Sequence, residues 1–376
     1  MILAIDCREF VPGRVTGIGR FLGGILEEIV QNRPRVAAIA LADQTTMIPV
    51  AAPHVSVHRL PRRPGLYLDQ VLFPRTLREI KATVFFSPYY KAPLGAPCPT
   101  VVTIHDLIPV TFPAYTRGWR RGFALAFRLW ATLLGRRATA VITDSEFSKG
   151  EIARRLGISA SRIHVMPIGV GGEFRPDHHA EDIRSTMSRY GIRGPYLLAV
   201  GNFLPHKNLS RLVEAHTTLP TAERERVSLV LAGSPAGHGP AHSLDRRTLG
   251  HDGVIMPGFI APEDLPRLYA GATALVCPSL VEGFGLPILE AMACGTPVVC
   301  ARAGALPEVA GDAALYFDPM IVADMAAALR RIAADETLRR TLRALGLSRA
   351  RDFDPRKTTA RLVDLLETVA VESGAS

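Results

Sequence analysis

The chain has 376 residues, 48% of them apolar, and a formal net charge of +9 at pH 7. This length fits two domains of ordinary size, and the apolar content excludes a disordered chain. Five cysteines without a C-x-x-C pair exclude a disulfide framework and a zinc knuckle, and no apolar stretch is long enough to span a bilayer.

The positive charge is concentrated in the first half of the chain. Residues 1–176 carry 23 Lys and Arg against 12 Asp and Glu, whereas residues 177–376 carry 21 against 23. This asymmetry points to an anionic partner for the first half, either a membrane surface, a lipid diphosphate or a nucleic acid. The interleaved acids make a nucleic acid the poorest fit, so we expect no nucleic-acid partner.

Apolar strands alternate with amphipathic helices, a pattern typical of parallel sheets covered by helices on both faces. The chain starts on a strand at residues 2–6 rather than on a signal peptide, so we expect a soluble, cytoplasmic protein. A glycine-rich break at residues 169–177 predicts two Rossmann-like α/β domains facing a cleft, residues 1–172 and 173–355. The predicted strands are residues 2–6, 36–41, 84–87, 101–104, 141–144 and 164–167 in the first domain, and 196–201, 228–232, 254–256, 274–278, 297–300 and 314–317 in the second.

Two glycines follow the first strand and begin a helix. The backbone amides of Gly17 and Gly19 can approach a sugar or a phosphate there. Leu22 stands where a dinucleotide fingerprint needs glycine, which disfavours a nicotinamide cofactor. On its own this signal is weak.

His105 and Asp106 stand at the carboxyl end of a predicted strand, the edge where α/β folds bind ligands. A lone histidine is more often structural, and that alternative stays open beside contact with a ligand. We expect Asp106 to brace its loop, and Ser145, after the next strand, to cap a helix.

Residues 116–138 carry six arginines and no acid, which predicts a basic amphipathic helix. Two interpretations stay open: the apolar stripe packs on the sheet with the arginines solvated, or the arginine-rich edge contacts anionic lipid headgroups. Arg117, Arg120, Arg121 and Arg128 are the candidates for facing that partner. The predicted apolar stripe comprises Trp119, Phe123, Phe127, Trp130 and Leu134.

The second domain opens with a strand, a loop and a helix that we expect Asn208 to cap. Lys207 stands just before that helix, where a point charge can neutralise a diphosphate, and His206 beside it can assist. The alternative for Lys207 is an ordinary exposed lysine in a loop.

The most informative segment is residues 278–299, PSLVEGFGLPILEAMACGTPVV, which follows the predicted strand 274–278. Gly283 and Gly285 let backbone amides approach a ligand closely, and Pro287 suits the first helical position. The helix start favours a phosphate or an electron-rich sugar oxygen.

Two glutamates flank this turn. Glu290 lies about one turn into the helix and can bind a ribose diol, as the acidic residue of a dinucleotide-binding fold does. Glu282 lies in the loop and can face a sugar instead. The alternative is an ordinary strand, turn and helix with solvated glutamates.

These motifs resemble the signature of the retaining family 4 glycosyltransferases, whose two glutamates are separated by seven residues. The likeness covers nearly the whole chain and is closest to bacterial members that extend surface or exopolysaccharide repeat units with mannose, rhamnose or glucose. One departure is Asn202, where many relatives have arginine, so that diphosphate binding leans more on Lys207 and backbone amides. The pieces that carry the likeness include Gly17-Ile-Gly19-Arg20, His105-Asp-Leu-Ile-Pro109, Ser145-Glu-Phe-Ser148 and residues 306–312, LPEVAGD.

The resemblance implies a glycosyltransferase B fold. A nucleotide-sugar donor would bind mainly to the second domain and a saccharide or polyprenyl-diphosphate-linked acceptor mainly to the first, and a last helix within residues 356–376 would cross back to the first domain. It implies transfer of a hexose, with mannose favoured, at the inner face of the cytoplasmic membrane, without a metal or other cofactor.

The resemblance also implies residue roles. The catalytic residues would be His105, Lys207 and Glu282, and Arg117, Arg120, Arg121 and Arg128 would face the acceptor or the membrane. The donor-binding residues would be Gly17, Gly19, Asn202, Lys207, Phe259, Glu282, Gly283, Phe284, Gly285, Leu286 and Glu290.

Three other functions fit parts of the sequence: a nucleotide-sugar sensor, an epimerase and a metal-dependent transferase. A catalytically silent nucleotide-sugar sensor would share every binding residue, and a sugar-nucleotide epimerase could use the same fold. Asp352-Phe-Asp354 matches the acidic triplet of metal-dependent glycosyltransferases with another fold, but no buried strand precedes it, so we expect helix capping instead.

Overall fold

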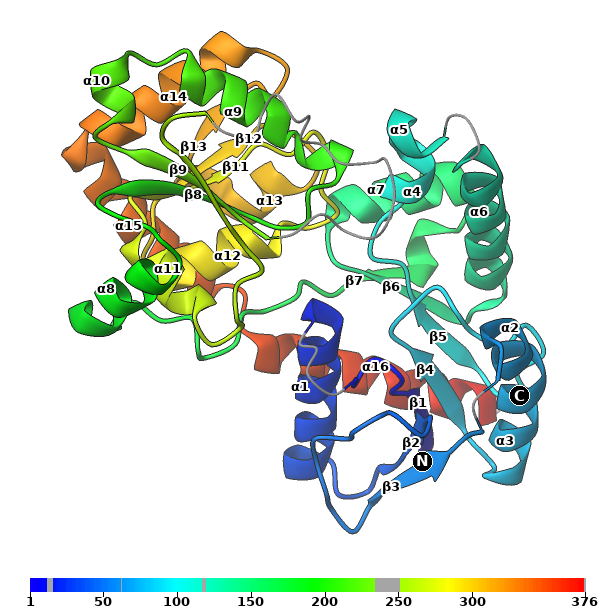
Figure 1. Cartoon of the computed structure of the whole chain (residues 1–376). Helices are drawn as coiled ribbons and strands as arrows, with labels where there is room; N and C mark the ends of the chain where they lie inside the picture. The colour runs from blue at the N-terminus through cyan, green and yellow to red at the C-terminus, as the bar shows by residue number, and fades with distance from the viewer. Residues whose placement is uncertain (12–15, 62, 117–119, 234–250, 375–376) are drawn as a thin grey trace. The chain divides into compact units, whose positions relative to one another are not determined.

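The computed structural model describes the chain except residues 12–15, 62, 117–119, 234–250 and 375–376 (Figure 1). The chain forms two compact units. The first comprises Met1–Gly169 with Asp354–Ser376, and the second comprises Val170–Phe353. Each is built on one sheet in which every described pair of neighbouring strands is parallel, which confirms the predicted α/β class.

The first sheet has seven described strands in the order β3-β2-β1-β4-β5-β6-β7. The sequence predicted six and missed β3 (Val55–Arg59), which pairs with β2 at the edge of the sheet. Three of the five residues of β3 are exposed, so the strand has no apolar run to reveal it. The other strands are β1 (Ile2–Asp6), β2 (Ala37–Ala42), β4 (Val84–Ser87), β5 (Thr100–Thr103), β6 (Ala140–Thr143) and β7 (Ile163–Val165).

Helices cover both faces of this sheet because successive side chains of a strand point to opposite faces. Leu3 and Ile5 of β1 share one core with the helices α1 (Gly17–Asn32) and α16 (Pro355–Gly374), while Ala4 belongs to the core on the other face. The helices α1 and α16 lie side by side (Figure 1), so the end of the chain belongs to the first unit. The helices α3 (Phe73–Glu79), α6 (Arg120–Arg137) and α7 (Glu146–Leu156) cover the second core.

The second sheet has six described strands in the order β10-β9-β8-β11-β12-β13. The first strand of this unit, β8, lies between β9 and β11, so the strand order reverses between β8 and β11. In open α/β sheets such a switch point leaves a crevice at the carboxyl ends of the strands, where ligands bind. The strands are β8 (Tyr196–Val200), β9 (Ser228–Ala232), β10 (Val254–Gly258), β11 (Ala274–Cys277), β12 (Val298–Ala301) and β13 (Ala314–Phe317).

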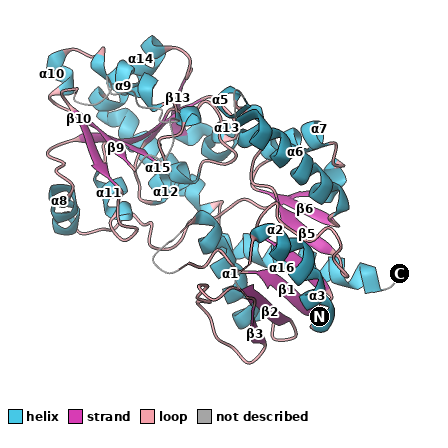
Figure 2. Cartoon of the chain, turned by 45° about the vertical axis from the view of Figure 1, so that its right-hand side comes forward, coloured by secondary structure: helices cyan, strands magenta, loops and turns pink. Residues whose placement is uncertain are grey.

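Helices alternate with these strands, and Figure 2 shows them beside the strands of each sheet. None of the described helices combines the length and the apolarity needed to cross a bilayer. The remaining helices of the first unit are α2 (Gly65–Tyr67), the π-helix Leu68–Leu72, α4 (Ile108–Thr111), α5 (Pro113–Thr116) and the 3-10 helix Ala160–Arg162. Those of the second unit are α8 (Ala180–Arg189), the 3-10 helices Pro205–Lys207 and Gly311–Ala313, α9 (Leu209–Thr217), α10 (Thr221–Arg224), α11 (Leu265–Gly271), α12 (Leu286–Ala293), α13 (Leu306–Ala310), α14 (Val322–Ala334) and α15 (Glu336–Arg351).

Candidate active site

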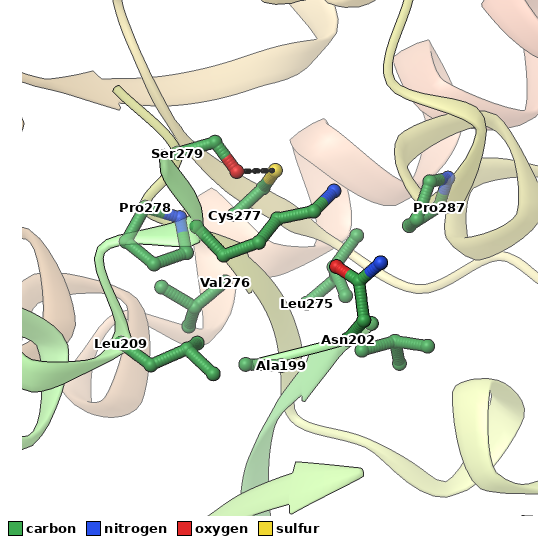
Figure 3. Close-up of a pocket in the computed structure, with 12 residues that line it drawn as sticks. Ala199, Asn202, Leu209, Leu275, Val276, Cys277, Pro278, Ser279 and Pro287 are labelled. Carbon is green, nitrogen blue, oxygen red and sulfur yellow. Dashed lines mark hydrogen bonds between the residues drawn. The ribbon is translucent and has the colours of Figure 1, made fainter. Parts of the chain in front are cut away.

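A small pocket lies at the switch point of the second sheet, where β8 and β11 end beside each other. Asn202 and Lys207 line it from the loop after β8, Ser279 from the loop after β11, and Pro287 from α12. Figure 3 shows Asn202, Ser279 and Pro287 around this pocket. Most of its polar lining therefore comes from strand-end loops, as expected for a ligand site in this fold.

Lys207 and Glu282 form an ion pair beside this pocket, with Lys207 Nζ 2.6 Å from Glu282 Oε1. The hydroxyl of Ser279 donates to the same carboxylate oxygen at 2.6 Å. Burial opposes the ionisation of Glu282, but the charge of Lys207 and these two hydrogen bonds lower the pKa of the carboxyl below its usual value. Glu282 is therefore a carboxylate, and Lys207 is not the freely exposed lysine that the sequence left as an alternative.

The turn after Glu282 depends on two glycines with positive φ. At Gly304, with φ +59°, a Cβ atom would lie 2.6 Å from the backbone N and O of Glu282. At Gly285, with φ +107°, it would lie 2.7 Å from a side-chain carbon of Leu306. A side chain at either position would displace the loop that carries Glu282.

The helix α12 begins at Leu286. Pro287 is therefore its second residue, whereas the sequence predicted it as the first. Gly283 and Phe284 lie buried in the turn before it. The ring of Phe284 packs edge to face against Phe353 at 5.9 Å between centroids, so its side chain belongs to the core of the unit. Only the backbone of Phe284 remains a candidate for contact with a ligand.

Glu290 lies in the middle of α12 and is 5% exposed. Its Oε2 accepts a hydrogen bond of 2.9 Å from the hydroxyl of Tyr269, a fully buried residue of α11. Glu290 is not among the residues that line the described pocket. The sequence had no signal for Tyr269, which lies 21 positions before Glu290.

The sequence predicted that the side chain of Asn208 caps α9, and this prediction is wrong. Asn208 occupies the N-cap position with φ 57° and ψ 28°, and its side chain makes no capping bond. Its amide group instead donates to the carbonyl oxygens of Pro278 at 3.1 Å and Pro319 at 2.9 Å. The side chain therefore ties the Lys207 loop to the end of β11.

His206 and Phe259 occupy contrasting surroundings. His206 is 6% exposed, and burial lowers its pKa to about 4, so the ring is neutral at pH 7. Phe259 follows β10 and is 71% exposed, outside the residues that line the pocket.

In the first unit, His105 follows β5 with both ring nitrogens against acceptors. Nδ1 lies 2.8 Å from Asp144 Oδ2, and Nε2 lies 3.2 Å from the carbonyl oxygen of Pro88. A neutral imidazole has one N–H, so two acceptors require the doubly protonated ring. Burial alone would lower the pKa of His105, but Asp144 and then Asp106 raise it to about 9.

The predicted local hydrogen bonds of Asp106 and Ser145 are confirmed. Asp106 Oδ1 accepts from the backbone N–H of Ile108 at 2.8 Å, and Ser145 caps α7 by accepting from the N–H of Ser148 at 3.0 Å. At α1, Thr16 is the N-cap residue and accepts from the N–H of Gly19 at 3.0 Å. The Gly19 amide is therefore already bonded, and a ligand there would compete with Thr16.

The switch point of the first sheet holds an ion cluster that the sequence did not single out. Asp6 ends β1 and bonds the guanidinium of Arg8 at 2.6 Å, and Asp69 bonds the same group at 2.7 Å. Beside them, Glu9 accepts hydrogen bonds from the hydroxyls of Thr16 and Tyr89. These contacts fix the loops after β1 and β4.

The helix α6 differs from its predicted pattern. Phe127 and Leu134 are buried as expected, but Phe123 is 60% exposed. A second apolar stripe faces outward, formed by Leu125, Leu129 and Leu133, which are 57%, 62% and 39% exposed. The arginines 121 and 128 of this helix are exposed, whereas Arg117, Trp119 and the side chain of Arg120 lie outside the described residues.

The acidic pair near the C-terminus has local roles. Asp354 Oδ1 accepts from the N–H of Arg356 at 2.9 Å at the start of α16, and Asp352 pairs with Arg349 at 3.1 Å. Among the described residues, no three His, Cys, Asp or Glu side chains converge on a possible metal position.

Comparison with known proteins identifies the family. Residues 15–172 match the family model Glycosyltransferase Family 4, and residues 187–347 match Glycosyl transferases group 1. The chain is 30% identical over 378 residues to the O-antigen chain mannosyltransferase B of Escherichia coli, a match that covers 96% of this chain and 98% of that one. It is 31% identical over 263 residues to the serotype-specific mannosyltransferase WbdA of Escherichia coli, covering 69% of this chain but 32% of that protein.

Solved structures share the fold over nearly the full length. HepE of Anabaena, in complex with UDP and glucose, has a TM-score of 0.75 at 21% identity, covering 97% of this chain and 99% of that chain. Sucrose-phosphate synthase of Thermosynechococcus elongatus has a TM-score of 0.75 at 20% identity, covering 99% and 100%. The chain therefore belongs to glycosyltransferase family 4 and has the glycosyltransferase B fold.

Proposed function

We propose that the chain is a retaining hexosyltransferase that moves mannose from a nucleoside-diphosphate sugar to a saccharide or a lipid-linked saccharide in surface polysaccharide synthesis. The observation that carries this proposal is the Lys207–Glu282 pair beside the pocket at the β8/β11 switch point. The relatives named as O-antigen mannosyltransferases support the choice of sugar and pathway, and HepE, solved with UDP and glucose, supports a nucleotide-sugar donor.

In this proposal Lys207 stabilises the leaving diphosphate. An ammonium group has three N–H donors, so Lys207 can bond phosphate oxygens while it keeps its bond to Glu282. Negative charge grows on the diphosphate as the bond between the anomeric carbon and its oxygen breaks, and a fixed cation there lowers the barrier. We propose that this charge serves where other transferases use a metal ion, and that no cofactor takes part.

We assign the remaining contacts with the donor to Glu282, Glu290 and the residues near them. Glu282 and the backbone amides from Gly283 to Leu286 would orient the hexose, Glu290 would bind the ribose, and Asn202 would line the donor site from the loop after β8. Phe259 would contribute an exposed aromatic face.

Retention follows if the acceptor attacks from the face that the diphosphate leaves. The acceptor hydroxyl oxygen forms the new bond to the anomeric carbon, and its proton passes to the departing phosphate oxygen. His105 is a poor general base because both of its ring nitrogens donate hydrogen bonds to Asp144 and Pro88. In the first unit, we propose that His105 supplies a fixed positive charge and that the Gly17–Gly19 segment contacts the sugar.

We also propose that α6 contacts the anionic inner face of the cytoplasmic membrane. Its outward stripe of leucines is flanked by the exposed Arg121 and Arg128, a combination that suits an interfacial helix. The arginines predicted before and at its start, Arg117 and Arg120, would add to the same charge. A peripheral location of this kind would place the enzyme near a polyprenyl-diphosphate-linked acceptor.

The test is turnover with a panel of nucleotide sugars and saccharide acceptors, followed by NMR of the anomeric configuration of the product. We expect hexose transfer from GDP-mannose with the configuration of the donor retained. An inverted product would refute the proposed mechanism. Binding without turnover would indicate a sensor, and conversion of the donor without an acceptor would indicate an epimerase.

A further inference from the structure

The buried hydroxyl of Tyr269 is placed to orient Glu290. Tyr269 is fully buried, and its hydroxyl lies 2.9 Å from Glu290 Oε2. A tyrosine hydroxyl next to a carboxylate can only donate, because a carboxylate has no proton to give. The geometry therefore fixes the direction of this hydrogen bond.

Tyr269 is held at its backbone and at its ring. The backbone carbonyl oxygen accepts a hydrogen bond of 2.6 Å from the hydroxyl of Thr296, and the ring packs edge to face on Phe174 at 6.0 Å between centroids. The hydroxyl therefore has little freedom to follow Glu290 if that side chain turns. Burial of both groups strengthens the bond relative to one in water.

The end of a glutamate side chain is intrinsically loose. Its last torsion joins an sp³ to an sp² carbon and has a broad energy minimum, so the carboxylate turns easily unless a neighbour holds it. A donor held at one oxygen restricts this rotation and so favours one direction for the second oxygen. On the basis of the function proposed above, we propose that Tyr269 is a positioning residue that orients Glu290 for the ribose hydroxyls of the donor.

This role has a signature that a purely structural role lacks. If Tyr269 acts through Glu290 on the ribose, its removal weakens only those ligands that carry ribose hydroxyls. A purely structural role would weaken every nucleotide alike, or none. The diagnostic quantity is therefore the ratio of affinities for a ribonucleoside diphosphate and for its 2′,3′-dideoxy analogue.

The experiment measures binding of GDP and UDP, and of their 2′,3′-dideoxy analogues, by calorimetry. Tyr269→Phe keeps the ring on Phe174 and removes only the hydroxyl. We expect about a tenfold loss of affinity for the ribonucleotide that the wild type prefers and no change for its dideoxy analogue. Glu290→Ala should give the same selectivity with a larger loss.

Tyr196→Phe is the matched control. Tyr196 is also fully buried in the second unit, and its hydroxyl donates to the carbonyl oxygen of Leu268 at 2.6 Å rather than to an acid. Both variants lose one buried hydrogen bond, so both should melt at a lower temperature, but Tyr196→Phe should keep wild-type affinity for all four nucleotides.

Four results would count against these assignments, and they are distinguishable. Equal affinity of Tyr269→Phe and the wild type for the ribonucleotide, or an equal loss for the dideoxy analogue, would overturn the role of Tyr269 alone. Glu290→Ala with unchanged affinity would refute the ribose site of the proposed function. A wild type that binds neither GDP nor UDP would overturn both.

Discussion

Lys207 and Glu282, 75 positions apart in the chain, lie 2.6 Å apart at the point where the strand order of the second sheet reverses. Parallel strands end at the same edge of a sheet, so β8 and β11 bring the two loops together. Neither partner is strongly exposed, with 17% of the Lys207 side chain and 11% of the Glu282 side chain accessible. The pair thus supports the loops as well as supplying charge to the pocket.

Replacing Lys207 should cost stability as well as activity. Lys207→Met leaves the carboxylate of Glu282 largely buried without its cation, so we expect the free energy of unfolding to fall by about 1–3 kcal/mol. The double variant Lys207→Met/Glu282→Gln should recover much of that loss in urea unfolding but none of the transferase activity. Recovery of activity in the double variant would contradict the role of Lys207 at the diphosphate.

Arg330→Ala provides the control for the loss of an ion pair. Arg330 and Glu223 pair at 3.0 Å, but 55% and 38% of their side chains are accessible. Solvent screening makes such a surface pair worth less than about 1 kcal/mol, so this variant should match the wild type in stability and activity.

Ionisation of His105 should make stability depend on pH above neutrality. Burial lowers the pKa of His105, but Asp144 and, to a smaller extent, Asp106 raise it, so that the pKa rises from 6.5 to about 9. Because the folded-state pKa lies above the unfolded value, this stabilisation is complete below pH 6.5 and is lost as the pH rises through about 9. We expect a decrease of at most about 3 kcal/mol in the free energy of unfolding over that range, measured in urea.

Asp144→Asn tests the cause of this dependence, because it removes the charge and keeps the shape. The variant should be less stable at pH 6.5 and should lose most of the pH dependence. His179→Gln, at an exposed histidine of the second unit, should leave the wild-type profile unchanged. A wild-type free energy of unfolding that stays constant between pH 6.5 and 9 would contradict the imidazolium assignment.

Ser279 should matter for turnover more than for nucleotide binding. Ser279 is 1% exposed, and its hydroxyl donates to Glu282 Oε1 at 2.6 Å, so Ser279→Ala removes one of the two described donors to this oxygen and loosens the carboxylate. We expect kcat to fall about tenfold and the affinity for the free nucleoside diphosphate to stay the same. Ser145→Ala, which removes a helix cap of the first unit, should lower stability by about 1 kcal/mol and leave kcat unchanged.

Membrane binding by α6 should depend on both leucines and arginines. In sedimentation with phosphatidylglycerol vesicles, we expect Leu125→Glu/Leu129→Glu to abolish binding and Arg121→Ala/Arg128→Ala to weaken it about 30-fold, at about 1 kcal/mol for each arginine. Leu345→Glu, at a leucine of α15 that is 41% exposed, is the control. Equal binding to neutral phosphatidylcholine vesicles would refute the electrostatic part.

The sequence predicted most of the sheet framework because buried parallel strands are short apolar runs. All six strands predicted for the second unit are present, including β9 and β13 with the predicted bounds. The strand β3 was missed because its residues are mostly exposed. Apolar periodicity finds buried strands, and it has little to detect at a polar sheet edge.

The contacts within the site were harder to predict because they join distant positions. Asp144 was foreseeable at a strand end, but its pairing with His105 depends on the register of β5 and β6. Asn208 looked like a helix cap, yet its side chain bonds two backbone carbonyls from other loops. Local rules predict local hydrogen bonds, and tertiary partners override them here.

A crystal structure with GDP or UDP bound would show whether Lys207 and Glu290 form the donor site. We predict that the diphosphate lies within hydrogen-bond distance of Lys207 Nζ, beside the start of α12, and that the ribose hydroxyls lie at Glu290. A nucleotide bound elsewhere in the chain, with the Lys207–Glu282 pair remote from its phosphates, would contradict it.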